Sequence, residues 1–453
     1  MYYVLGLGQT GLSVVKYLKR HHLACEVFDD KISPNGLSAF HTEFPDVTVH
    51  CHEIFDEHEH AIENIKEVII SPGVPLTHPI ARLAQKKGIP VVGDIELFAR
   101  QTDVPVVAIT GTNGKSTVTA LVGEMAKAAG LKVLVGGNIG VPVLDQGEEN
   151  FDWVVLELSS FQLESTYTLH PKIACILNIT PDHMDRYATF EAYAAAKHRI
   201  YENADNAVMC ADDSLSMPPL NSPFYKREHS SLTCFGLVEP SVNHPWGIQT
   251  HEGQKYLAYG QERWLNVEEL KIKGTHNWSN ALAALAIGHL MGISQAVLCD
   301  VLKSFPGLEH RCQWVREVDQ VTWYNDSKGT NVGSTLAAIK GLGDAHKGKI
   351  ILLLGGQAKG ADFSELREPI QQHVRTIILY GQDADQIQEM LKETAPIIRV
   401  KTFEEVIHQA QQEAHPQDII LLSPACASWD MFDNYGHRGK VFVELVQKLT
   451  KCY

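Results

Sequence analysis

Short apolar runs, each ending in glycine or polar residues, recur along the chain and predict an α/β fold. They predict strands over residues 25–28, 67–70, 106–109, 132–135, 153–156, 173–177, 321–324, 349–354, 376–380, 398–400 and 418–422. Helical patterns lie between them, the clearest over residues 12–18 and 277–291. Strands that alternate with helices and end in polar residues are typical of doubly wound, mostly parallel sheets.

One stretch breaks this alternation. Residues 213–262 are rich in proline near 218–223 and then show short polar alternations around Gly253 and Gly260, which predicts hairpins and loops. The stretch lies inside the second of three segments into which we divide the chain: 1–93, 94–304 and 305–453. A length of 453 residues fits about three domains.

The charge balance narrows the range of partners. Acidic residues number 54 against 39 Lys and Arg, a formal net charge of −15, which disfavours bulk attraction to nucleic acid or anionic lipid. No apolar run reaches the roughly 18 residues needed to cross a bilayer, and residues 1–6 predict a first strand rather than a signal peptide. The cysteines are scattered and form no CxxC pair. This pattern favours reduced thiols in a cytoplasmic protein.

The strongest local motif for chemistry is Ala-Ile-Thr-Gly-Thr-Asn-Gly-Lys-Ser-Thr at residues 108–117. A predicted strand runs into a glycine turn and then a helix, which is the context of a phosphate-binding loop. Backbone N–H groups and the helix N-terminus attract phosphate, Lys115 reaches the β- and γ-phosphates, and Ser116 ligates Mg²⁺. The loop is shorter than the usual spacing G-x-x-x-x-G-K-S/T.

Two further strands end in residues that suit such a site. The run at 153–156 is followed by Glu157, which we expect to face Mg²⁺, and the run at 173–177 leads through Asn178 to His183. Ligands of doubly wound sheets bind at the carboxyl ends of the strands. From the residues alone, we favour the Mg²⁺ role of Glu157 over that of a surface carboxylate at a strand end. His183 is equally well a structural or solvated histidine.

The N-terminal glycine turn leaves an alternative open. Gly6, Gly8 and Gly11 follow a predicted strand with the spacing G-x-G-x-x-G, and Asp29 ends the next strand. This is the pattern of a nicotinamide-dinucleotide site, and on that interpretation the chain is an oxidoreductase.

A histidine-rich tract follows in the same segment. His50, His52, His58 and His60 are interleaved with Cys51 and acidic residues. We interpret the tract as a solvated face rather than a metal site.

Taken together, the motifs resemble the Mur ligases, ATP-dependent amide-bond ligases of peptidoglycan precursor synthesis. The resemblance covers the whole chain. Beyond the phosphate-binding loop it rests on residues 157–163, 178–186, 274–277 with Asn280, 309–311, 325–331 and 422–428. It implies three domains: a Rossmann-like domain at 1–93, a P-loop ATPase-like domain with added hairpins at 94–304, and a second Rossmann-like domain at 305–453.

The resemblance also implies roles at the ATP site. Catalysis would rest on Lys115, His183 and Lys197, and Lys197 matches a lysine that CO₂ carbamylates into an anionic metal-bridging ligand. From the sequence alone, Lys197 is an exposed helical lysine. Mg²⁺ would be held by Ser116, Glu157, His183 and Lys197. ATP would contact Gly111, Thr112, Asn113, Gly114, Lys115, Ser116, Thr117, Asn277, Asn280, Arg311 and Asp326.

For the substrates, the resemblance implies UDP-N-acetylmuramoyl-L-alanine and D-glutamate, because the N-terminal turn and residues 181–186 and 422–428 match the D-glutamate-adding branch of the family. The nucleotide sugar would meet Gln9, Thr10, Lys31, Ser71, Gly73 and Asn138. D-Glutamate would meet Lys328, Thr330, Lys359, Ser428 and Tyr435.

The chain departs from the family pattern at two places. Asp30-Lys31 stands where the pattern carries Thr-Arg, so the site would offer a point charge in place of a bidentate fork. Tyr435 stands where phenylalanine is common, and Trp429 and Met431 also differ.

The implied reaction is an ADP-forming ligation through an acyl phosphate. It would serve cell-wall biogenesis, and with it cell shape and division, in the cytoplasm. We expect a monomer that binds no nucleic acid. The dinucleotide-dependent oxidoreductase and a nucleotide-binding switch or transport ATPase remain the alternatives from the sequence.

Overall fold

The computed structural model describes residues 1–32, 34, 37–52, 64–146, 150–228, 230–343 and 348–449. The chain divides into two compact units. The first comprises Met1–Asn178, Glu191–Phe235 and Ala283–Leu298. The second comprises Ile179–Phe190, Gly236–Leu282 and Cys299–Tyr453.

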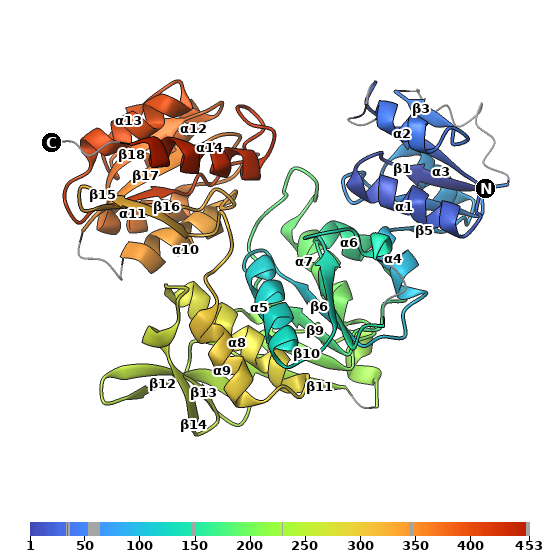
Figure 1. Ribbon diagram of the computed structural model, residues 1–453, viewed down its shortest axis with the longest axis horizontal. Coiled ribbons are helices and arrows are strands. Elements are labelled where there is room, and N and C mark those ends of the chain that lie inside the picture. The colour runs from blue at the N-terminus through green and yellow to red at the C-terminus, as the bar shows by residue number, and fades with distance from the viewer. Residues whose placement is uncertain are drawn as a thin grey trace. The chain divides into compact units, whose positions relative to one another are not determined.

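A parallel sheet at the N-terminus opens the first unit (Figure 1). Its strands run in the order β3-β2-β1-β4-β5 and pair in parallel. The central strands β1 and β4 are buried along their whole length, as expected where helices cover both faces of a parallel sheet. The strands are β1 (Tyr2–Leu5), β2 (Cys25–Asp29), β3 (Val49–Cys51), β4 (Glu67–Ile70) and β5 (Val91–Val92), and the helices are α1 (Gln9–Arg20), α2 (Leu37–Glu43), α3 (Pro79–Lys86) and α4 (Asp94–Ala99).

The phosphate-loop motif lies on a second parallel sheet of the same unit. Its strands follow the order β11-β10-β9-β6-β8-β7, and helix α5 packs against β7 and β8. The continuous apolar runs of β6, β8 and β9 reflect burial on both faces. The elements are β6 (Val106–Thr110), β7 (Val133–Gly137), β8 (Trp153–Glu157), β9 (Ile173–Ile176), β10 (Asn206–Cys210), β11 (Ser231–Phe235), α5 (Lys115–Ala128), α6 (Ser160–Glu164) and α7 (Phe190–His198).

The irregular stretch at 213–262 holds strands of both kinds. The antiparallel hairpins predicted there are confirmed by β12 (Trp246–His251), β13 (Gln254–Tyr259) and β14 (Glu262–Asn266). Strand β11 is different, because it continues the parallel sheet beside β10. The long helix predicted at 277–291 is α8 (Thr275–Leu290), and α9 (Gln295–Ser304) follows it.

The third sheet belongs to the second unit and is doubly wound. Its order is β15-β16-β20-β17-β18-β19, parallel except for the β15–β16 hairpin. Alternate residues of β17 enter two different cores, Ile350, Leu352 and Leu354 on one face and Ile351 and Leu353 on the other. The elements are β15 (Gln313–Val318), β16 (Val321–Asn325), β17 (Ile350–Gly355), β18 (Val374–Tyr380), β19 (Ile397–Arg399), β20 (Ile419–Leu422), α10 (Val332–Gly343), α11 (Arg367–His373), α12 (Ala384–Leu391), α13 (Phe403–Glu413) and α14 (Tyr435–Lys448).

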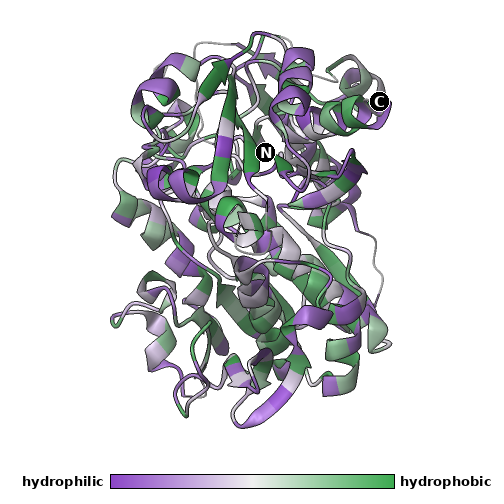
Figure 2. Cartoon of the chain, turned by 90° about the vertical axis from the view of Figure 1, so that its left-hand side faces the viewer, coloured by the Kyte–Doolittle hydropathy of each residue, from purple (hydrophilic) through white to green (hydrophobic). Residues whose placement is uncertain are grey.

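Short 3₁₀ helices connect these elements. The hydropathy of the residues differs between the strands and the helices. In Figure 2 the strands are mostly coloured as hydrophobic, whereas the helices carry both hydrophilic and hydrophobic residues. Among the described residues, no helix combines the length and the apolar character needed to cross a membrane. The 3₁₀ helices are η1 (Val143–Asp145), η2 (Arg199–Tyr201), η3 (Ser214–Ser216), η4 (Pro223–Lys226), η5 (Val267–Glu269) and η6 (Ser364–Leu366).

The α/β class with several mostly parallel sheets, predicted from the sequence, is confirmed. Each predicted strand corresponds to a strand of the structure with limits that differ by at most about two residues. The limits predicted for the three segments stay predictions.

Candidate active site

The phosphate-binding loop joins the end of β6 to the start of α5. Gly114 caps the helix with a left-handed φ of +85°, and Gly111 has a φ of +151°. A Cβ at Gly111 would lie 3.1 Å from the Cβ of Leu177 and 3.3 Å from the backbone nitrogen of Asn178. Both positions therefore need glycine, which explains why the loop carries two of them.

Asn178 holds the loop in place. Its carbonyl oxygen accepts the N–H of Thr112 at 2.8 Å, and its side-chain oxygen accepts the N–H of Asn113 at 2.8 Å. Its amide nitrogen donates to the carbonyl oxygen of Asn113 at 3.1 Å. Asn178 is the first residue after the strand run 173–177, so the sequence located it without revealing this role.

Two predicted catalytic lysines meet at one backbone oxygen. Lys115 and Lys197 each donate from Nζ to the carbonyl oxygen of Gly111 at 2.8 Å, and Lys115 also donates to the carbonyl oxygen of Thr112 at 2.8 Å. Lys197 is only 2% exposed, so its interpretation as an exposed helical lysine is wrong. Helix α7 turns this side chain inward toward the loop.

Tyr193 lies under Lys197 and was missed from the sequence. The Nζ atom of Lys197 is 4.7 Å from the centroid of the tyrosine ring, within cation–π range. The Tyr193 hydroxyl forms a hydrogen bond of 3.0 Å with the hydroxyl of Thr112. Tyr193 and Lys197 are four residues apart on one helix, a spacing that places them on the same face.

Glu157 and Asn138 come together at the ends of β8 and β7. The Asn138 amide nitrogen donates to Oε1 of Glu157 at 2.9 Å, and the Asn138 backbone N–H donates to the Glu157 carbonyl oxygen at 2.8 Å. A Cβ on Gly137 would lie 2.2 Å from that carbonyl oxygen. Gly137 thus allows strand β7 to come close to β8, and Asn138, which we expect to contact the substrate, lies beside Glu157, which we expect to face Mg²⁺.

The donor set fits a magnesium ion that keeps ligands from phosphate and water. Ser116 and Glu157 are 2% and 1% exposed, and both offer hard oxygen atoms, which Mg²⁺ prefers. The described residues contain no cluster of three or more His, Cys, Asp or Glu able to hold a metal without such ligands.

The N-terminal glycine turn carries the predicted nucleotide-sugar residues. Gly6 has a φ of +91°, and a Cβ at Gly11 would lie 1.9 Å from the carbonyl oxygen of Gly6. Ser71, which follows β4, donates from Oγ to the same oxygen at 3.2 Å. Gln9 and Thr10 begin α1 beside this turn, and Gly73 lies two residues beyond Ser71.

Asp29 has a structural task at this turn. Its two carboxylate oxygens accept the backbone N–H groups of Leu7 at 2.7 Å and Lys31 at 2.9 Å. The carboxylate thereby fixes the ends of β1 and β2, and it presents the exposed Lys31 beside the turn. Both carboxylate oxygens of Asp29 accept backbone N–H groups. The presence of an acidic residue at this position therefore has a structural reason that needs no bound dinucleotide.

The histidine-rich tract is described only in part, because His58, Glu59 and His60 lie outside the described residues. His50 stacks on Phe28 with ring centroids 4.5 Å apart, and its Nε2 atom is 3.1 Å from a carboxylate oxygen of Glu26. These contacts tie His50 to strand β2.

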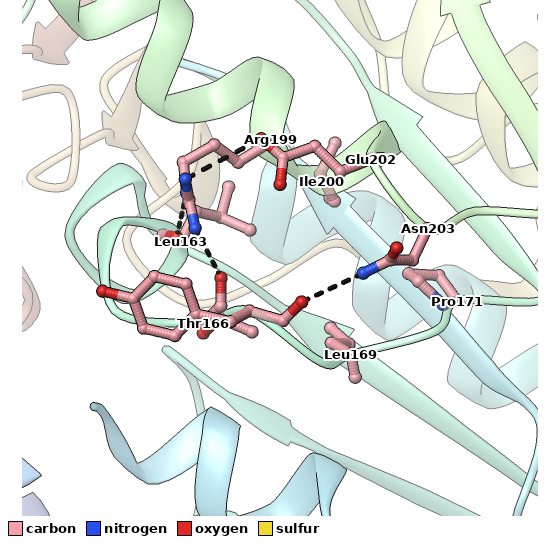
Figure 3. Close-up of a pocket in the computed structure, with 9 residues that line it drawn as sticks. Leu163, Thr166, Leu169, Pro171, Arg199, Ile200, Glu202 and Asn203 are labelled. Carbon is pink, nitrogen blue, oxygen red and sulfur yellow. Dashed lines mark hydrogen bonds and ion pairs between the residues drawn. The ribbon is translucent and has the colours of Figure 1, made fainter. Parts of the chain in front are cut away.

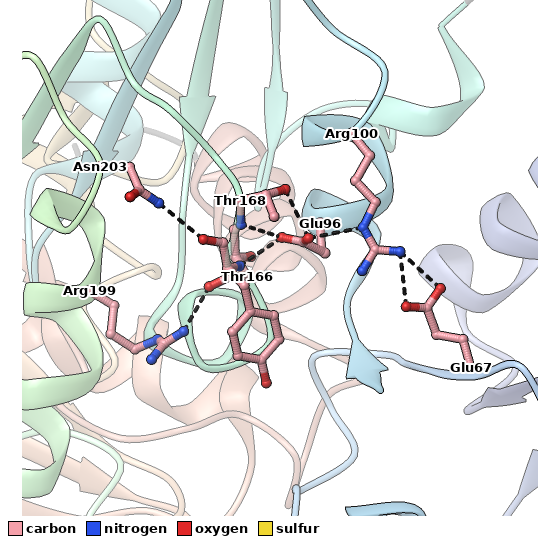
Figure 4. A network of polar contacts seen from close by, with 8 residues as sticks. Glu67, Glu96, Arg100, Thr166, Thr168, Arg199 and Asn203 are labelled. Carbon is pink, nitrogen blue, oxygen red and sulfur yellow. Dashed lines mark hydrogen bonds and ion pairs between the residues drawn. The ribbon is translucent and has the colours of Figure 1, made fainter. Parts of the chain in front are cut away.

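A polar network links strand β4 to the loop that follows α6 (Figure 4). Glu96 is 1% exposed and accepts the N–H groups of Tyr167 and Thr168, the Thr168 hydroxyl and Nε of Arg100 at 2.7–3.0 Å. Arg100 in turn donates to both oxygens of Glu67. Burial acts to raise the pKa of Glu96, but the hydrogen bonds outweigh it and hold the pKa below its ordinary value.

The same loop is tied to the region of Lys197. Arg199 donates from Nε to the carbonyl oxygen of Leu163 at 2.7 Å and from Nη2 to that of Thr166 at 2.8 Å. These bonds lie beside a cavity of about 10 Å³ (Figure 3), which holds at most about one water molecule. The region is thus packed as a support for α7, not as a ligand pocket.

Within the second unit, Asp182 organises the segment that carries His183. The Asp182 carboxylate accepts the backbone N–H of His183 at 2.9 Å and the side-chain N–H of Asn331 at 3.1 Å. His183 has a left-handed φ of +56°, uncommon outside glycine and asparagine. Such strained conformations occur where surroundings over-determine them, often at functional sites.

The predicted adenine-side residues lie in three places: Asn277 and Asn280 on α8, Arg311 before β15, and Asp326 directly after β16. Asn280 donates to the side-chain oxygen of Asn277 at 3.1 Å, so the structure brings this pair together. Asp326 is buried, and this burial raises its pKa to about 6. Hydrogen bonds from Ser423 at 2.7 Å and from the Cys312 N–H at 3.1 Å, with the charge of Arg311, act in the opposite direction.

The predicted acceptor residues share the carboxyl end of the third sheet. They follow three adjacent strands or begin α14: Lys328 and Thr330 after β16, Lys359 after β17, Ser428 after β20, and Tyr435 at the first position of α14.

Backbone hydrogen bonds lock these three loops together. The N–H of Ala425 donates to the carbonyl oxygen of Gly329 at 2.9 Å, and Gln357 and Ala427 exchange two backbone bonds of 3.0 and 2.9 Å. The loops that carry Lys328, Lys359 and Ser428 therefore form one connected surface.

Two departures from the family pattern are visible here. Nζ of Lys328 lies 5.2 Å from the centroid of the Tyr435 ring, a contact that a phenylalanine ring would also provide. Trp429 is 70% exposed, so its large side chain does not fill the core of this region.

A phosphate-binding loop with two converging lysines, on an α/β scaffold with a second doubly wound sheet, defines a nucleotide-dependent enzyme. The chain belongs to the Mur ligase family. Three family models match it: the Mur ligase MurD-like N-terminal domain at residues 1–93, the Mur ligase middle domain at 109–288, and the Mur ligase glutamate ligase domain at 310–426.

Full-length relatives carry a more specific name. The UDP-N-acetylmuramoylalanine--D-glutamate ligase of Legionella pneumophila (strain Paris) is 50% identical, with 99% of each chain covered. The protein of that name from Pseudomonas aeruginosa (strain PAO1) is 46% identical over 99% of this chain and 98% of its own. None of these relatives supports the oxidoreductase alternative.

Solved structures share the fold at low identity. MurF from Acinetobacter baumannii superposes with a TM-score of 0.62 at 16% identity, covering 98% of this chain and 93% of that one. The UDP-N-acetylmuramate-alanine ligase MurC from Thermotoga maritima gives 0.61 at 18%, covering 98% and 99%. At such identity the likeness establishes the fold alone.

Proposed function

We propose that this chain is the ATP-dependent ligase that joins D-glutamate to UDP-N-acetylmuramoyl-L-alanine in peptidoglycan precursor synthesis, releasing ADP and phosphate. The observation that carries the proposal is the meeting of Lys115 and Lys197 at the Gly111 carbonyl. A simple phosphate-binding loop needs only the first lysine. The second, buried beside it, fits a chain whose full-length relatives carry this ligase name.

The chemistry requires activation of a carboxylate. A carboxylate oxygen is a poor leaving group, so the γ-phosphoryl group is first transferred to the L-alanyl carboxylate. The D-glutamate amine then attacks the acyl phosphate, and phosphate leaves. Lys115 and the loop N–H groups neutralise the phosphoryl charge as it develops, while Asn138 orients the acyl end.

Ser116, Glu157 and His183 are the residues that would hold Mg²⁺, together with an anionic carbamate on Lys197. The ion would neutralise charge on the phosphate oxygens. The buried position of Lys197 beside the loop, held by Gly111 and Tyr193, supports this assignment. Asn277, Asn280, Arg311 and Asp326 would bind the adenine nucleotide.

We assign one substrate to each of the three segments of the chain. We assign residues 1–93 to the nucleotide sugar, 94–304 to ATP and 305–453 to D-glutamate. Gln9, Thr10 and Ser71 surround a glycine turn where the N-terminus of α1 favours a phosphate. Lys328, Thr330, Lys359, Ser428 and Tyr435 would bind the two carboxylates of the acceptor. We place the reaction in the cytoplasm and expect a monomer.

Product analysis tests this proposal. The protein is incubated with ATP, Mg²⁺, UDP-N-acetylmuramoyl-L-alanine and D-glutamate, and the nucleotide products are separated and weighed by mass spectrometry. The expected product carries one additional glutamyl residue and forms together with ADP. Formation of AMP, or ADP without a glutamyl product, would contradict the proposal.

A further inference from the structure

A guanidinium is fully buried behind the loops of the third sheet. Arg438 of α14 is 0% exposed. Its Nε donates to Oγ of Ser327 at 3.0 Å, and its Nη2 donates to the carbonyl oxygen of the same residue at 2.8 Å. Both terminal nitrogens also reach the carbonyl oxygen of Cys426 at 3.2 Å. One side chain thus connects two loops that are far apart in the sequence.

Those two loops carry the proposed acceptor residues. Ser327 directly precedes Lys328, and Cys426 lies two residues before Ser428. The Ser327 hydroxyl also donates to the carbonyl oxygen of Tyr435 at 2.8 Å, which adds the start of α14 to the same cluster. The planar fork of arginine suits such a bridge, because its donors point in fixed directions.

No carboxylate among the described residues lies within ion-pair distance of Arg438. Its hydrogen bonds to Ser327 and Cys426 end on neutral acceptors, one hydroxyl and two carbonyl oxygens, and it also interacts with the Tyr380 hydroxyl. Burying a cation without an anion is unfavourable. A ligand with two carboxylates, bound on the loops that Arg438 supports, would bring further negative charge close to the guanidinium.

We infer that Arg438 is a positioning residue for the acceptor amino acid, holding the Ser327 and Cys426 loops in register and favouring a dianionic acceptor through its buried charge. This inference rests on the proposed function, because D-glutamate is the dicarboxylate concerned. Arg438 does not itself contact substrate. Its replacement should therefore raise the KM for D-glutamate and leave the KM values for the other two substrates nearly unchanged.

The test compares steady-state kinetics of Arg438→Lys and Arg438→Met with the unaltered enzyme. Arg438→Lys keeps the charge but loses the fork, and we expect the KM for D-glutamate to rise about 10-fold. Arg438→Met also loses the charge, and the expected rise is about 100-fold, in line with the loss of charge-assisted hydrogen bonds. The KM values for ATP and the nucleotide sugar should change by no more than about twofold.

Arg316 provides a matched control in the same sheet. It also donates only to carbonyl oxygens, those of Val446, Gln447 and Leu449 at 2.8–3.3 Å, but at the opposite end of α14. Arg316→Met should lower thermal stability while leaving the KM for D-glutamate unchanged. A general loss of packing would affect both arginine sites alike.

A milder variant guards against loss of folding. Ser327→Ala removes one acceptor of Arg438 and leaves the guanidinium in place, and we expect the KM for D-glutamate to rise about threefold or more. Folded Arg438 variants with an unchanged KM for D-glutamate would overturn the inference. If they do not fold, an unchanged KM in Ser327→Ala would overturn it. Absence of D-glutamate-dependent turnover in the unaltered enzyme would instead contradict the proposed function.

Discussion

The ammonium of Lys197 donates a hydrogen bond to the carbonyl oxygen of Gly111, 2.8 Å away. Lys115 donates to the same oxygen over the same distance. Two like charges that share one acceptor repel each other at close range. Conversion of Lys197 to a carbamate would replace this repulsion by attraction, which gives the modification a physical reason at this position.

Replacing Lys197 by alanine should reduce turnover at least about 100-fold, because the anionic ligand proposed beside the phosphoryl group would be lost. Short carboxylates such as acetate or formate should restore part of the activity by occupying the same space. A rescue series over carboxylate concentration measures this effect. Full activity of Lys197→Ala would remove the carbamate from the mechanism.

The carbamate itself is measurable without turnover. Protein equilibrated with ¹³C-labelled bicarbonate should show a carbamate carbon signal by NMR that is absent in Lys197→Ala. Lys127 on α5, which pairs with Glu124 at the surface, is a suitable control, because Lys127→Ala should keep the signal.

Replacing Lys115 by alanine should lower the turnover number about 100-fold or more, since charge on the transferred phosphoryl group is no longer neutralised. Binding of the nucleotide sugar should stay nearly unchanged, because its proposed site lies at the N-terminal glycine turn. Calorimetric titration with UDP-N-acetylmuramoyl-L-alanine checks this separation. An equal loss of sugar binding would mean that the ligands are assigned to the wrong sheets.

Glu96 should contribute strongly to stability. Glu96→Gln keeps the size of the side chain but removes the charge that accepts from Arg100, Tyr167 and Thr168, and we expect a loss of about 2–3 kcal/mol. Glu124→Gln, which removes an exposed pair with Lys127, should cost at most about 1 kcal/mol. Urea unfolding of both variants makes the comparison, and similar midpoints would contradict the role of the Glu96 network.

Asp94 should make stability depend on pH. It is 3% exposed, and burial raises its pKa to about 6. The folded state therefore binds a proton that the unfolded state has released, and stability falls as pH rises from about 4 to 6. Asp94→Asn removes this effect, so it should be more stable than the unaltered protein by about 1–3 kcal/mol at pH 8.

The advantage of Asp94→Asn should shrink toward zero near pH 4, where the carboxyl is protonated in both states. Thermal unfolding at pH 4.5 and pH 8 measures the difference. An equal effect of the substitution at both pH values would show that Asp94 does not titrate in this window.

Local sequence patterns were sufficient to predict the strands, the clearest helices and the phosphate-binding loop. Buried parallel strands require continuous apolar runs, and the loop requires glycine where φ is positive, as at Gly114. Strand β11 lies in the stretch 213–262, for which hairpins and loops were predicted, because a local alternating pattern carries no information on the partner of a strand. Pairing depends on contacts across the sheet, and the residues of β11 pair with residues of β10 that lie 25 positions earlier in the chain.

The side chains that act through burial were harder to predict. Lys197 was interpreted from the sequence as an exposed helical lysine, and no motif in the sequence singled out Arg438. Only the packing of the folded chain shows that these two cations are enclosed. The role of Lys197 came from resemblance to a family, and that of Arg438 from the structure.

The central claim is that D-glutamate is the acceptor of an acyl phosphate formed from ATP. The most direct measurement is phosphate release with ATP, Mg²⁺ and UDP-N-acetylmuramoyl-L-alanine, with each amino acid supplied in turn. The account predicts release that depends on the nucleotide sugar and is selective for D-glutamate. Release without any acceptor, or equal release with L-lysine or D-alanine, would contradict it.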